Sequence, residues 1–336
     1  MKISEDFSLS TYNTFGIEAR TKYFISCETA DEIVSFRREP RFRDVPFILF
    51  GGGSNILFTK DYSGVVLKPA LMGIETTRED EDYAWLRVGA GEEWDAFVQR
   101  SVEMGLGGVE NLSGIPGTAG SSPVQNIGAY GCEVKDTIQH VELLNLETLQ
   151  YETLQNNACR FAYRDSVFKR EMKGKAVVLA VMFRLSKKPQ FITGYGNIQE
   201  ELKGYSGANL ETMRELILAM RRRKLPDPAV TGNAGSFFKN PVIDARTLSL
   251  LRGKWPALPN YPLKTGGAKI PAAWLIEQCG WKGYRKGDAG VHQNQPLVLV
   301  NYGKATGEEI LQLSREITDS VTQKFNIRLE TEVNIV

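Results

Sequence analysis

The sequence has few of the residues that mark several large protein classes. Only two histidines, His140 and His292, occur in 336 residues. This scarcity removes histidine-rich metal chemistry and leaves little room for a Ser-His-Asp hydrolase. The four cysteines are scattered without a CxxC pair, so neither a zinc site nor a disulfide framework is expected. We interpret them as buried, reduced thiols of a cytoplasmic protein.

An excess of charge of one sign is also missing. Lys and Arg number 41 and Asp and Glu number 40, so the formal net charge is +1. This balance argues against a nucleic-acid-binding protein, whose footprint is a basic excess. No segment approaches the ~18 apolar residues of a membrane span. Residues 1–20 lack the apolar core of a signal peptide. We therefore expect a cytoplasmic protein that binds neither nucleic acid nor membrane.

Apolar patterning predicts an α+β protein with mixed sheets. Strands are expected at 46–58 (two stretches around a glycine turn), 64–69, 84–90, 137–146, 176–185 and 328–336. Helices are expected at 92–104, 211–223, 272–279 and 308–324. Thr306 and Glu309 form a capping box before the last helix, and Gly105 follows the first as a C′ residue.

Glycine accounts for 32 residues and gathers in two segments. The first is Gly51, Gly52 and Gly53, followed by Ser54 and Asn55. Its backbone can approach an anion closely, although a plain tight turn explains it equally well. The second, 114–131, has many small residues and few charges. That composition suits a backbone packed against a flat ligand, and the alternative is an ordered structural loop.

Two nucleotide-binding motifs are excluded. The turn Gly89-Ala90-Gly91 follows a strand and opens a helix, as in a Rossmann fingerprint. Trp94, however, cannot provide the close helix–strand contact of the third glycine, and Glu92 and Glu93 would repel a pyrophosphate. We interpret it as a structural turn. No GxxxxGK[ST] motif occurs, which disfavours a Walker-type NTPase.

Three further segments place polar residues within otherwise structural sequence: 161–169, 232–241 and 329–333. Each also has an ordinary structural interpretation. Asp165 or Ser166 could cap a helix, Ser236 could lie in a turn, and Glu330 and Glu332 could share the solvated face of an edge strand.

Taken in order, these motifs resemble the UDP-N-acetylenolpyruvoylglucosamine reductase family over nearly the whole chain. The motifs are NTFG (13–16), GGGSN (51–55), SGIPGTAGSSPVQNIGAYG (113–131), FAYRDSVFK (161–169), GYGNIQ (194–199), RRRKLPDP (221–228), GNAGSFFKNP (232–241), VHQNQPLVLVN (291–301) and LETEV (329–333). The GYGNIQ and HQNQPLVLVN segments are similar to the longer, type I form.

The resemblance implies an FAD-binding fold of the vanillyl-alcohol-oxidase (PCMH) type in two subdomains, with a smaller α/β substrate-binding domain. We expect the subdomains at 1–70 and 71–223, the substrate-binding domain at 224–327, and a last strand, 328–336, returning near the first subdomain. It further implies non-covalent FAD, NADPH as reductant and a UDP-sugar substrate. The enolpyruvyl ether of UDP-N-acetylglucosamine would be reduced to UDP-N-acetylmuramate for peptidoglycan synthesis, by a protein expected to be a monomer.

The resemblance also assigns catalytic roles, which agree with the chemistry. Hydride delivered to C3 of the enolpyruvyl group leaves negative charge on C2 and the carboxylate, which requires preorganised cations or acidic donors. Arg164 of the YRDS motif would bind that carboxylate. Glu332 would either stabilise the intermediate as an acid or polarise Arg164 as a carboxylate. Ser236 would donate the proton to C2.

Binding residues carry over from the same motifs, and no metal site is implied. The expected FAD contacts are Gly51, Gly52, Gly53, Ser54, Asn55, Gly114, Ile115, Pro116, Gly117, Thr118, Gly120, Ser121, Ser122, Asn126 and Tyr130. The expected substrate contacts are Tyr195, Lys224, Asn240 and Gln295. For Lys224, a charge that complements the end of a helix is the structural alternative.

Two other functions compete with the reductase. One is an FAD oxidase or dehydrogenase of the same fold acting on another sugar or alcohol. Many such oxidases attach flavin to a histidine, and neither histidine lies in the glycine-rich segments. The other is a non-catalytic flavin or UDP-sugar binding protein, which would have no need of the proton donor Ser236.

Overall fold

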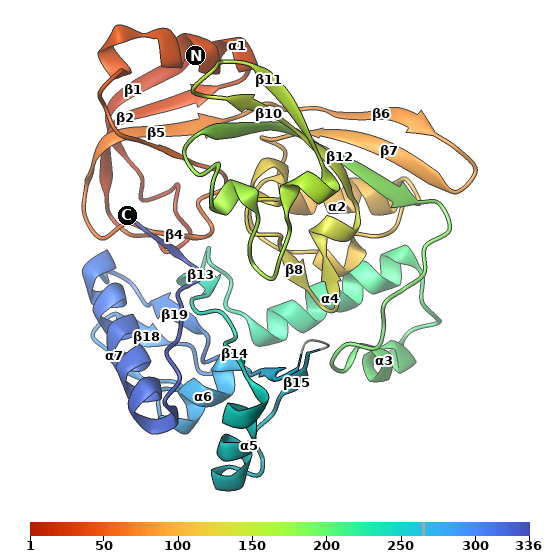
Figure 1. Cartoon of the computed structure of the whole chain (residues 1–336), viewed down its shortest axis with the longest axis vertical. Helices are drawn as coiled ribbons and strands as arrows, with labels where there is room; N and C mark the ends of the chain where they lie inside the picture. Colours follow the sequence, from red (N-terminus) through yellow and green to blue (C-terminus); the bar gives the residue numbers. More distant parts are fainter. Residues whose placement is uncertain (264–265) are drawn as a thin grey trace. The chain divides into compact units, whose positions relative to one another are not determined.

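The structure is a computed structural model that describes residues 1–263 and 266–336 (Figure 1). It divides into two compact units, each assembled from separate stretches of the chain. Unit 1 comprises Met1–Phe7, Thr21–Gly53 and Ser63–Arg223. Unit 2 comprises Ser8–Arg20, Ser54–Tyr62 and Lys224–Val336. Helices and strands occur throughout both units, so the expected α+β class is confirmed.

Two larger sheets organise unit 1. The first has the strand order β1 (Lys2–Ser8), β2 (Arg20–Cys27), β5 (Tyr62–Pro69), β3 (Phe47–Leu49). The second has the order β11 (Tyr151–Gln155), β10 (Ile138–Asn145), β12 (Ala176–Ser186), β7 (Tyr83–Gly89), β6 (Ile74–Glu79). A short hairpin joins β8 (Gly128–Ala129) to β9 (Cys132–Glu133). In Figure 1 the β6–β7 hairpin extends well beyond the other strands of its sheet.

The helices of unit 1 bury narrow apolar stripes. They are α1 (Ala30–Arg38), α2 (Trp94–Glu103), α3 (Ile198–Glu201) and α4 (Leu210–Lys224). The last residue of α4, Lys224, begins the third stretch of unit 2. The stripe of α2 consists of Trp94, Phe97, Val98 and Val102, as the sequence predicts. Gly105 has a φ of 72° directly after it, which confirms its role in ending the helix.

Unit 2 is built around the C-terminal helix. Its sheets have the orders β13 (Gly232–Ser236), β19 (Val298–Asn301), β18 (Ala289–Val291), β17 (Arg285–Lys286) and β14 (Val242–Ile243), β16 (Ala268–Lys269), β15 (Tyr261–Pro262). Its helices are α5 (Ala245–Lys254), α6 (Ala272–Gln278) and α7 (Gly307–Phe325). The Thr306–Glu309 capping box is present at the start of α7. Phe15, Ile17 and Leu57, from the two early stretches, share a core with α6 and α7.

The expected strand at 328–336 is wrong in extent. Only β20 (Asn334–Ile335) is a strand, and it pairs in parallel with β4 (Ile56–Leu57). Thr331 makes an isolated bridge to Phe238. The alternating pattern of residues 328–333 therefore reflects extended chain beside another segment, without a continuous ladder.

The Gly89–Gly91 turn is structural, as the sequence predicts. A Cβ at Gly89 would lie 2.3 Å from the Leu71 carbonyl oxygen. The carboxylate of Glu92 accepts a hydrogen bond of 2.6 Å from the Gly73 amide, and the Trp94 indole donates to the Leu112 carbonyl at 2.9 Å. The residues that would bind a dinucleotide in a Rossmann turn are thus engaged in packing.

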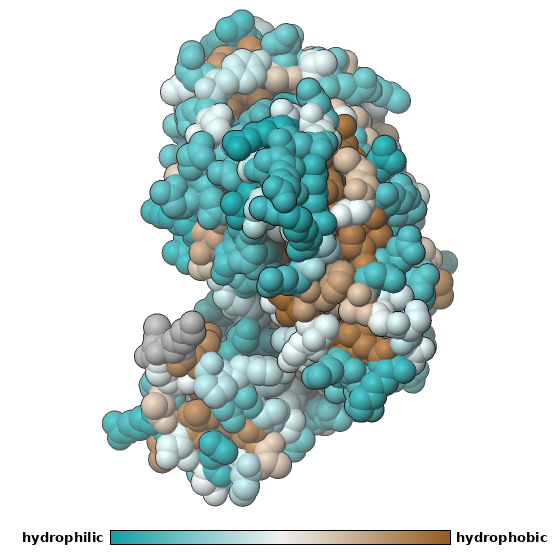
Figure 2. Space-filling model, turned by 90° about the vertical axis from the view of Figure 1, so that its right-hand side faces the viewer, coloured by the Kyte–Doolittle hydropathy of each residue, from teal (hydrophilic) through white to brown (hydrophobic). Residues whose placement is uncertain are grey.

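Hydrophilic residues predominate on the face of the molecule displayed in Figure 2, where hydrophobic residues form smaller patches. Among the described residues, none of the helices combines the length and the hydropathy that a membrane crossing requires.

Candidate functional site

The two glycine-rich segments meet within unit 1. A Cβ at Gly52 would lie 2.8 Å from the Cα of Gly117. A Cβ at Gly51 would lie 3.1 Å from the Cβ of Ser121 and 3.2 Å from Oγ1 of Thr118. Real Cβ atoms do not approach backbone as closely as 2.8 Å, so the contact at Gly52 requires a glycine. Segments about 65 residues apart in sequence thus form one backbone surface.

The amide groups of this surface fall into two sets. Those of Thr118 and Gly120 are used within the protein, donating to Ser121 Oγ at 3.0 Å and to the Ala90 carbonyl at 3.0 Å. The amides of Gly51, Gly52 and Gly117 donate to none of the described residues. Adjacent backbone N–H groups without protein acceptors are the donors that an anionic group such as a diphosphate requires. The residues therefore fit FAD.

An ion pair fixes the start of the second segment. The Asp95 carboxylate accepts a 2.6 Å hydrogen bond from the Gly114 amide and two from Arg214, at 2.6 and 2.8 Å. Burial opposes ionisation of Asp95, but these donors outweigh it and lower the pKa of the carboxyl below its ordinary value of 3.8. Gly114 is thereby tied to both α2 and α4.

The later residues of the segment bond mainly to the protein itself. Ile115 packs on the core of unit 1, and the buried Ser122 hydroxyl donates to the Ala119 carbonyl at 2.7 Å. Asn126 is fully buried and donates to the Ala162 carbonyl at 3.0 Å. The chain has positive φ at Asn126 (46°) and Tyr130 (49°). These contacts hold the segment in shape, whichever ligand it faces.

Arg164 lies against the same segment. Its Nη2 group donates to the Gly128 carbonyl at 2.6 Å, and a Cβ at Gly128 would lie 3.1 Å from Nη1. Arg164 itself has a φ of 54°, unusual for a residue with a side chain. Two residues later, Ser166 caps a short 3₁₀ turn by accepting from the Phe168 amide. The YRDS motif thus contains both the predicted cap and a guanidinium held beside the glycine-rich segment.

Two tyrosines meet at the edge of this region. The rings of Tyr130 and Tyr195 pack edge to face with centroids 6.5 Å apart, and Tyr195 is 45% exposed. Burial raises the pKa of the Tyr130 hydroxyl, while the nearby charges of Arg221 and Arg223 oppose the rise. A predicted cofactor residue and a predicted substrate residue are therefore neighbours.

Ser236 and Glu332 lie on adjacent segments of unit 2. Ser236 ends β13 and is exposed, and the Glu332 amide donates to the carbonyl of the neighbouring Phe237 at 2.8 Å. The turn before Ser236 is formed by Gly235 (φ 68°), whose amide donates to the Asn233 side chain at 2.9 Å. Two of the three predicted catalytic residues are thus brought together, while Arg164 belongs to unit 1.

Asn55 also lies in this part of unit 2, as does the preceding Ser54. The Asn55 side chain donates to the Glu332 carbonyl at 3.2 Å. The Asn55 carbonyl accepts from the backbone and the side chain of Asn334, at 3.1 and 2.9 Å. The GGGSN motif therefore spans the boundary, with its glycines in unit 1 and its polar residues in unit 2.

The other predicted substrate residues differ in their exposure and in their hydrogen bonds. Lys224 is exposed at the end of α4. The Asn240 side chain accepts a 2.9 Å hydrogen bond from the Ala272 amide at the start of α6. Gln295 is 8% exposed, and its backbone carbonyl accepts a hydrogen bond from the Val298 amide. Asn240 and Gln295 thus serve the local structure in addition to any ligand.

Sequence reasoning missed three residues that shape the site: Asp95, Asn111 and Asn233. Asp95 occupies an ordinary position in a predicted helix, and its ion pair to α4 leaves no local pattern. Asn111 and Asn233 are buried amides that bond to backbone. The one available signal was an asparagine within or beside a glycine-rich motif.

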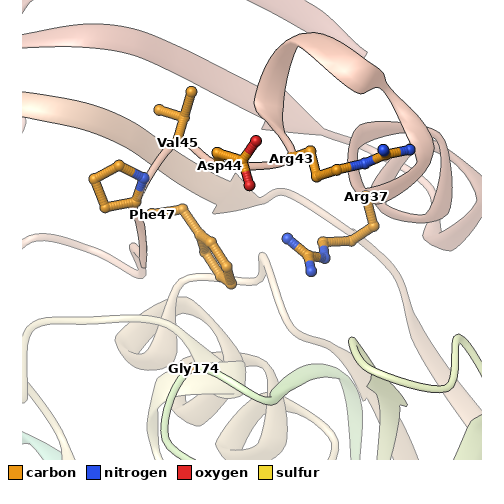
Figure 3. Close-up of a pocket in the computed structure, with 7 residues that line it drawn as sticks. Arg37, Arg43, Asp44, Val45, Phe47 and Gly174 are labelled. Atoms are coloured by element: carbon orange, nitrogen blue, oxygen red, sulfur yellow. The ribbon is translucent and has the colours of Figure 1, made fainter.

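A surface hollow of about 480 Å³ lies elsewhere in unit 1, between α1, β3 and Gly174 (Figure 3). It is lined by Arg37, Arg43, Asp44, Val45, Pro46, Phe47 and Gly174, none of which was predicted as a site residue. Arg37 is engaged locally, since its guanidinium lies 5.3 Å from the Phe47 ring centroid and donates to the Leu146 carbonyl at 3.4 Å. We assign this hollow no role in the site.

Comparison with protein families agrees with this geometry. Residues 21–148 match an FAD binding domain, and residues 227–336 match the C-terminal domain of UDP-N-acetylenolpyruvoylglucosamine reductase. The predicted FAD-binding fold is confirmed by the first match. The second match contains the segments of both Ser236 and Glu332.

Individual relatives align over the full length. A UDP-N-acetylenolpyruvoylglucosamine reductase of Chromobacterium violaceum is 48% identical, over 99% of this chain and 98% of its own. One from Flavobacterium johnsoniae is 45% identical over the whole of both chains. The crystal structure of the reductase from Thermus caldophilus matches with a TM-score of 0.67 at 24% identity, covering 99% of this chain and 98% of its own. By its full-length relatives, this chain belongs to the UDP-N-acetylenolpyruvoylglucosamine reductase family.

Proposed function

We propose that the protein reduces the enolpyruvyl ether of UDP-N-acetylglucosamine to UDP-N-acetylmuramate, a step in peptidoglycan precursor synthesis. It uses NADPH and non-covalently bound FAD. The observation that carries this proposal is the exposed Ser236 hydroxyl beside the segment of Glu332. A protein that only bound flavin or nucleotide would need no proton donor. The Ser236–Glu332 arrangement therefore favours the reductase over a binding protein.

The FAD contacts that we propose are those of the two glycine-rich segments: Gly51–Gly53, Ser54, Asn55, Gly114–Thr118, Gly120–Ser122, Asn126 and Tyr130. The amides of Gly51, Gly52 and Gly117, which donate to none of the described residues, would bind its diphosphate. Held there, FAD would supply hydride-transfer chemistry between NADPH and the methylene carbon C3 of the enolpyruvyl group.

Arg164 and Glu332 would stabilise the charge that follows hydride delivery. An electron pair then lies on C2 and the adjacent carboxylate of the substrate. Arg164, whose guanidinium is held by its bond to the Gly128 carbonyl, would place its positive charge beside that carboxylate. Such a preorganised charge costs no rearrangement at the moment of reaction, which is why it lowers the barrier. Glu332 would support the same charge as an acid, or polarise Arg164 as a carboxylate.

Ser236 would complete the reduction by donating its hydroxyl proton to C2. The hydride adds to C3 and the proton to C2, so the double bond becomes saturated and NADPH becomes NADP⁺. A hydroxyl is a weak acid in water, but the acceptor carbon is strongly basic. Solvent then restores the proton to the serine.

The substrate contacts that we propose are Tyr195, Lys224, Asn240 and Gln295, around the UDP diphosphate and sugar. Lys224 supplies an exposed cation suited to phosphate oxygens. We also propose a monomer with an FAD-binding part at 1–70 and 71–223 and a substrate-binding part at 224–327. Its four free thiols and its nucleotide reactants suit the cytoplasm, and its near-neutral charge suits a protein with no nucleic-acid partner.

An anaerobic absorbance experiment tests the function. The purified flavoprotein is bleached with one equivalent of NADPH, and the enolpyruvyl UDP-sugar is then added. We expect prompt return of the oxidised flavin spectrum without oxygen. A flavin that stays reduced would show that the natural acceptor is another compound, and a protein that binds no FAD on reconstitution would exclude the flavoenzyme altogether.

A further inference from the structure

We infer that Asn111 is a positioning residue that joins the cofactor segment to the segment that carries Tyr195. The inference rests on the proposed function, since it assigns Tyr130 to the cofactor and Tyr195 to the substrate. Asn111 is fully buried within unit 1, in the 3₁₀ turn Glu110–Leu112. It touches neither ligand in the proposal and would act through the two tyrosines.

The side-chain amide of Asn111 bridges two carbonyls. Its Nδ2 group donates one hydrogen bond to the Tyr130 carbonyl and one to the Ile192 carbonyl, each of 2.9 Å. An amide NH₂ has two donors, so both are used. The reverse orientation would set Oδ1 against two carbonyl oxygens, so the two contacts fix which way the amide points.

The bond to Ile192 is the main polar anchor of the segment before Tyr195. Residues 189–194 lie in neither helix nor strand. The Asn111–Ile192 bond is their one hydrogen bond to another described segment. Pro189 makes an apolar anchor at the other end, because a Cβ at Gly107 would lie 2.3 Å from its Cβ. The Ile192 side chain is 44% exposed and contributes little burial, whereas the neighbouring Phe191 packs on the cluster of Ile198, Met213, Leu216 and Ile217.

The bond to Tyr130 connects the segment before Tyr195 to the glycine-rich segment. A Cβ at Gly131 would lie 3.1 Å from Cγ2 of Ile192 and 3.2 Å from Cβ of Tyr195. This approach places the Tyr195 ring edge to face with the Tyr130 ring. Without the bridge, the Tyr130 and Ile192 carbonyls lose their donor, and only side-chain packing holds the segment of Tyr195 to the glycine-rich segment.

Kinetics of the Asn111→Leu holoenzyme test the inference. Leucine fills a similar volume but donates to neither carbonyl. We expect KM for the enolpyruvyl UDP-sugar to rise about tenfold or more. The rate of flavin reduction by NADPH and the FAD content should stay within about twofold. The matched control is Ser101→Ala, which removes a buried hydroxyl that bonds only within α2. The smaller substitution Asn111→Ser serves if leucine prevents folding.

A double-mutant cycle with Tyr195→Ala separates positioning from general damage. If Asn111 acts through Tyr195, the double variant has the KM of Tyr195→Ala alone. Effects that multiply would overturn the inference, as would an unchanged KM in Asn111→Leu. A loss of kcat at unchanged KM would overturn it too.

Limited proteolysis provides a readout that needs no substrate. We expect chymotrypsin to cleave after Phe191 and Tyr195 faster in Asn111→Leu than in wild type, and no change there in Ser101→Ala. Unchanged cleavage rates would overturn the bridge. If wild-type protein does not transfer electrons to the enolpyruvyl UDP-sugar, the proposed function fails, and substrate positioning fails with it. If wild type turns over and the variants keep its KM, only the inference about Asn111 fails.

Discussion

The backbones of Gly52 and Gly117 touch so closely that a single added Cβ at Gly52 would lie 2.8 Å from the Cα of Gly117. Neither atom can move like the end of a flexible side chain. We expect Gly52→Ala to push the two glycine-rich segments apart and to weaken FAD affinity by about tenfold or more. The ratio of flavin absorbance to protein absorbance after gel filtration measures this loss.

Gly253→Ala is the matched control for that substitution. A Cβ at Gly253, in α5, meets open space. This variant should keep its flavin and gain about 0.5–1 kcal/mol of stability, as expected for alanine in a helix. Full flavin retention in Gly52→Ala would show that the two segments can move apart without loss of FAD affinity. It would contradict the proposed FAD site.

Ser236→Ala should separate the two half-reactions. The variant cannot protonate C2, so we expect kcat to fall by about 10²–10⁴ while flavin reduction by NADPH is kept. Stopped-flow absorbance follows both steps. Ser314→Ala, which removes a buried hydroxyl of α7, should leave both rates unchanged. Turnover at the wild-type rate in Ser236→Ala would remove the proton-donor assignment.

Arg164→Lys keeps the positive charge and loses the planar fork of donors. We expect kcat to fall about a hundredfold, because one ammonium cannot hold the Gly128 carbonyl and a substrate carboxylate in the same geometry. Arg170→Lys is the control, since the exposed Arg170 pairs with the half-buried Asp165 and is not one of the proposed site residues. Equal kcat in the two variants would mean that charge alone suffices at position 164.

Glu332 and Glu330 form a natural pair of test and control on one segment. Glu332 is half-buried, whereas Glu330 is exposed and pairs with Lys239 at 3.3 Å. We expect Glu332→Gln to lower kcat by about a hundredfold and Glu330→Gln to change it little. A larger effect of Glu330→Gln would show that Glu330, and not Glu332, is the catalytic glutamate of the LETEV motif.

Asp95 should make the thermal stability of the protein depend on pH in the acidic range. Because the pKa of its carboxyl is lowered in the folded state, its contribution is complete well above the ordinary value of 3.8 and is lost as pH falls through the folded pKa. Asp95→Asn should therefore lower Tm at pH 7 and flatten the fall in Tm below about pH 4. Asp319→Asn, at an exposed site on α7, should keep the wild-type profile. Parallel profiles for wild type and Asp95→Asn would refute the linkage.

Strong periodicity explains which elements could be predicted. The expected helices at 92–104, 211–223, 272–279 and 308–324 all form, within about two residues at each end, because each has a buried apolar stripe. Helices α1, α3 and α5 were missed. Helix α1 buries only Ile33 and Phe36, α3 only Ile198 and α5 only Leu251, so none of them has an apolar stripe that stands out from its surroundings.

The candidate site was predictable only where residue types are unusual. Glycine clusters pointed to the two segments that meet at Gly52 and Gly117, although a tight turn or an ordered structural loop would have the same composition. No local pattern could reveal Asp95, and the only sign of Asn111 and Asn233 was their place beside or within a glycine-rich motif. Their importance depends on partners distant in the chain, such as Arg214 and Ile192, or on backbone carbonyls that sequence does not display.

The divided make-up of unit 2 has a consequence for protein synthesis. Phe15, Ile17 and Leu57 leave the ribosome early, yet the core that they join is completed by α6 and α7. About 270 residues separate Leu57 from the end of α7 at Phe325. At roughly 5–20 residues per second, Leu57 waits some 15–55 s until its partners are complete. A nascent chain that stalls before residue 224 therefore displays these three side chains to solvent, where chaperones and proteases can recognise it.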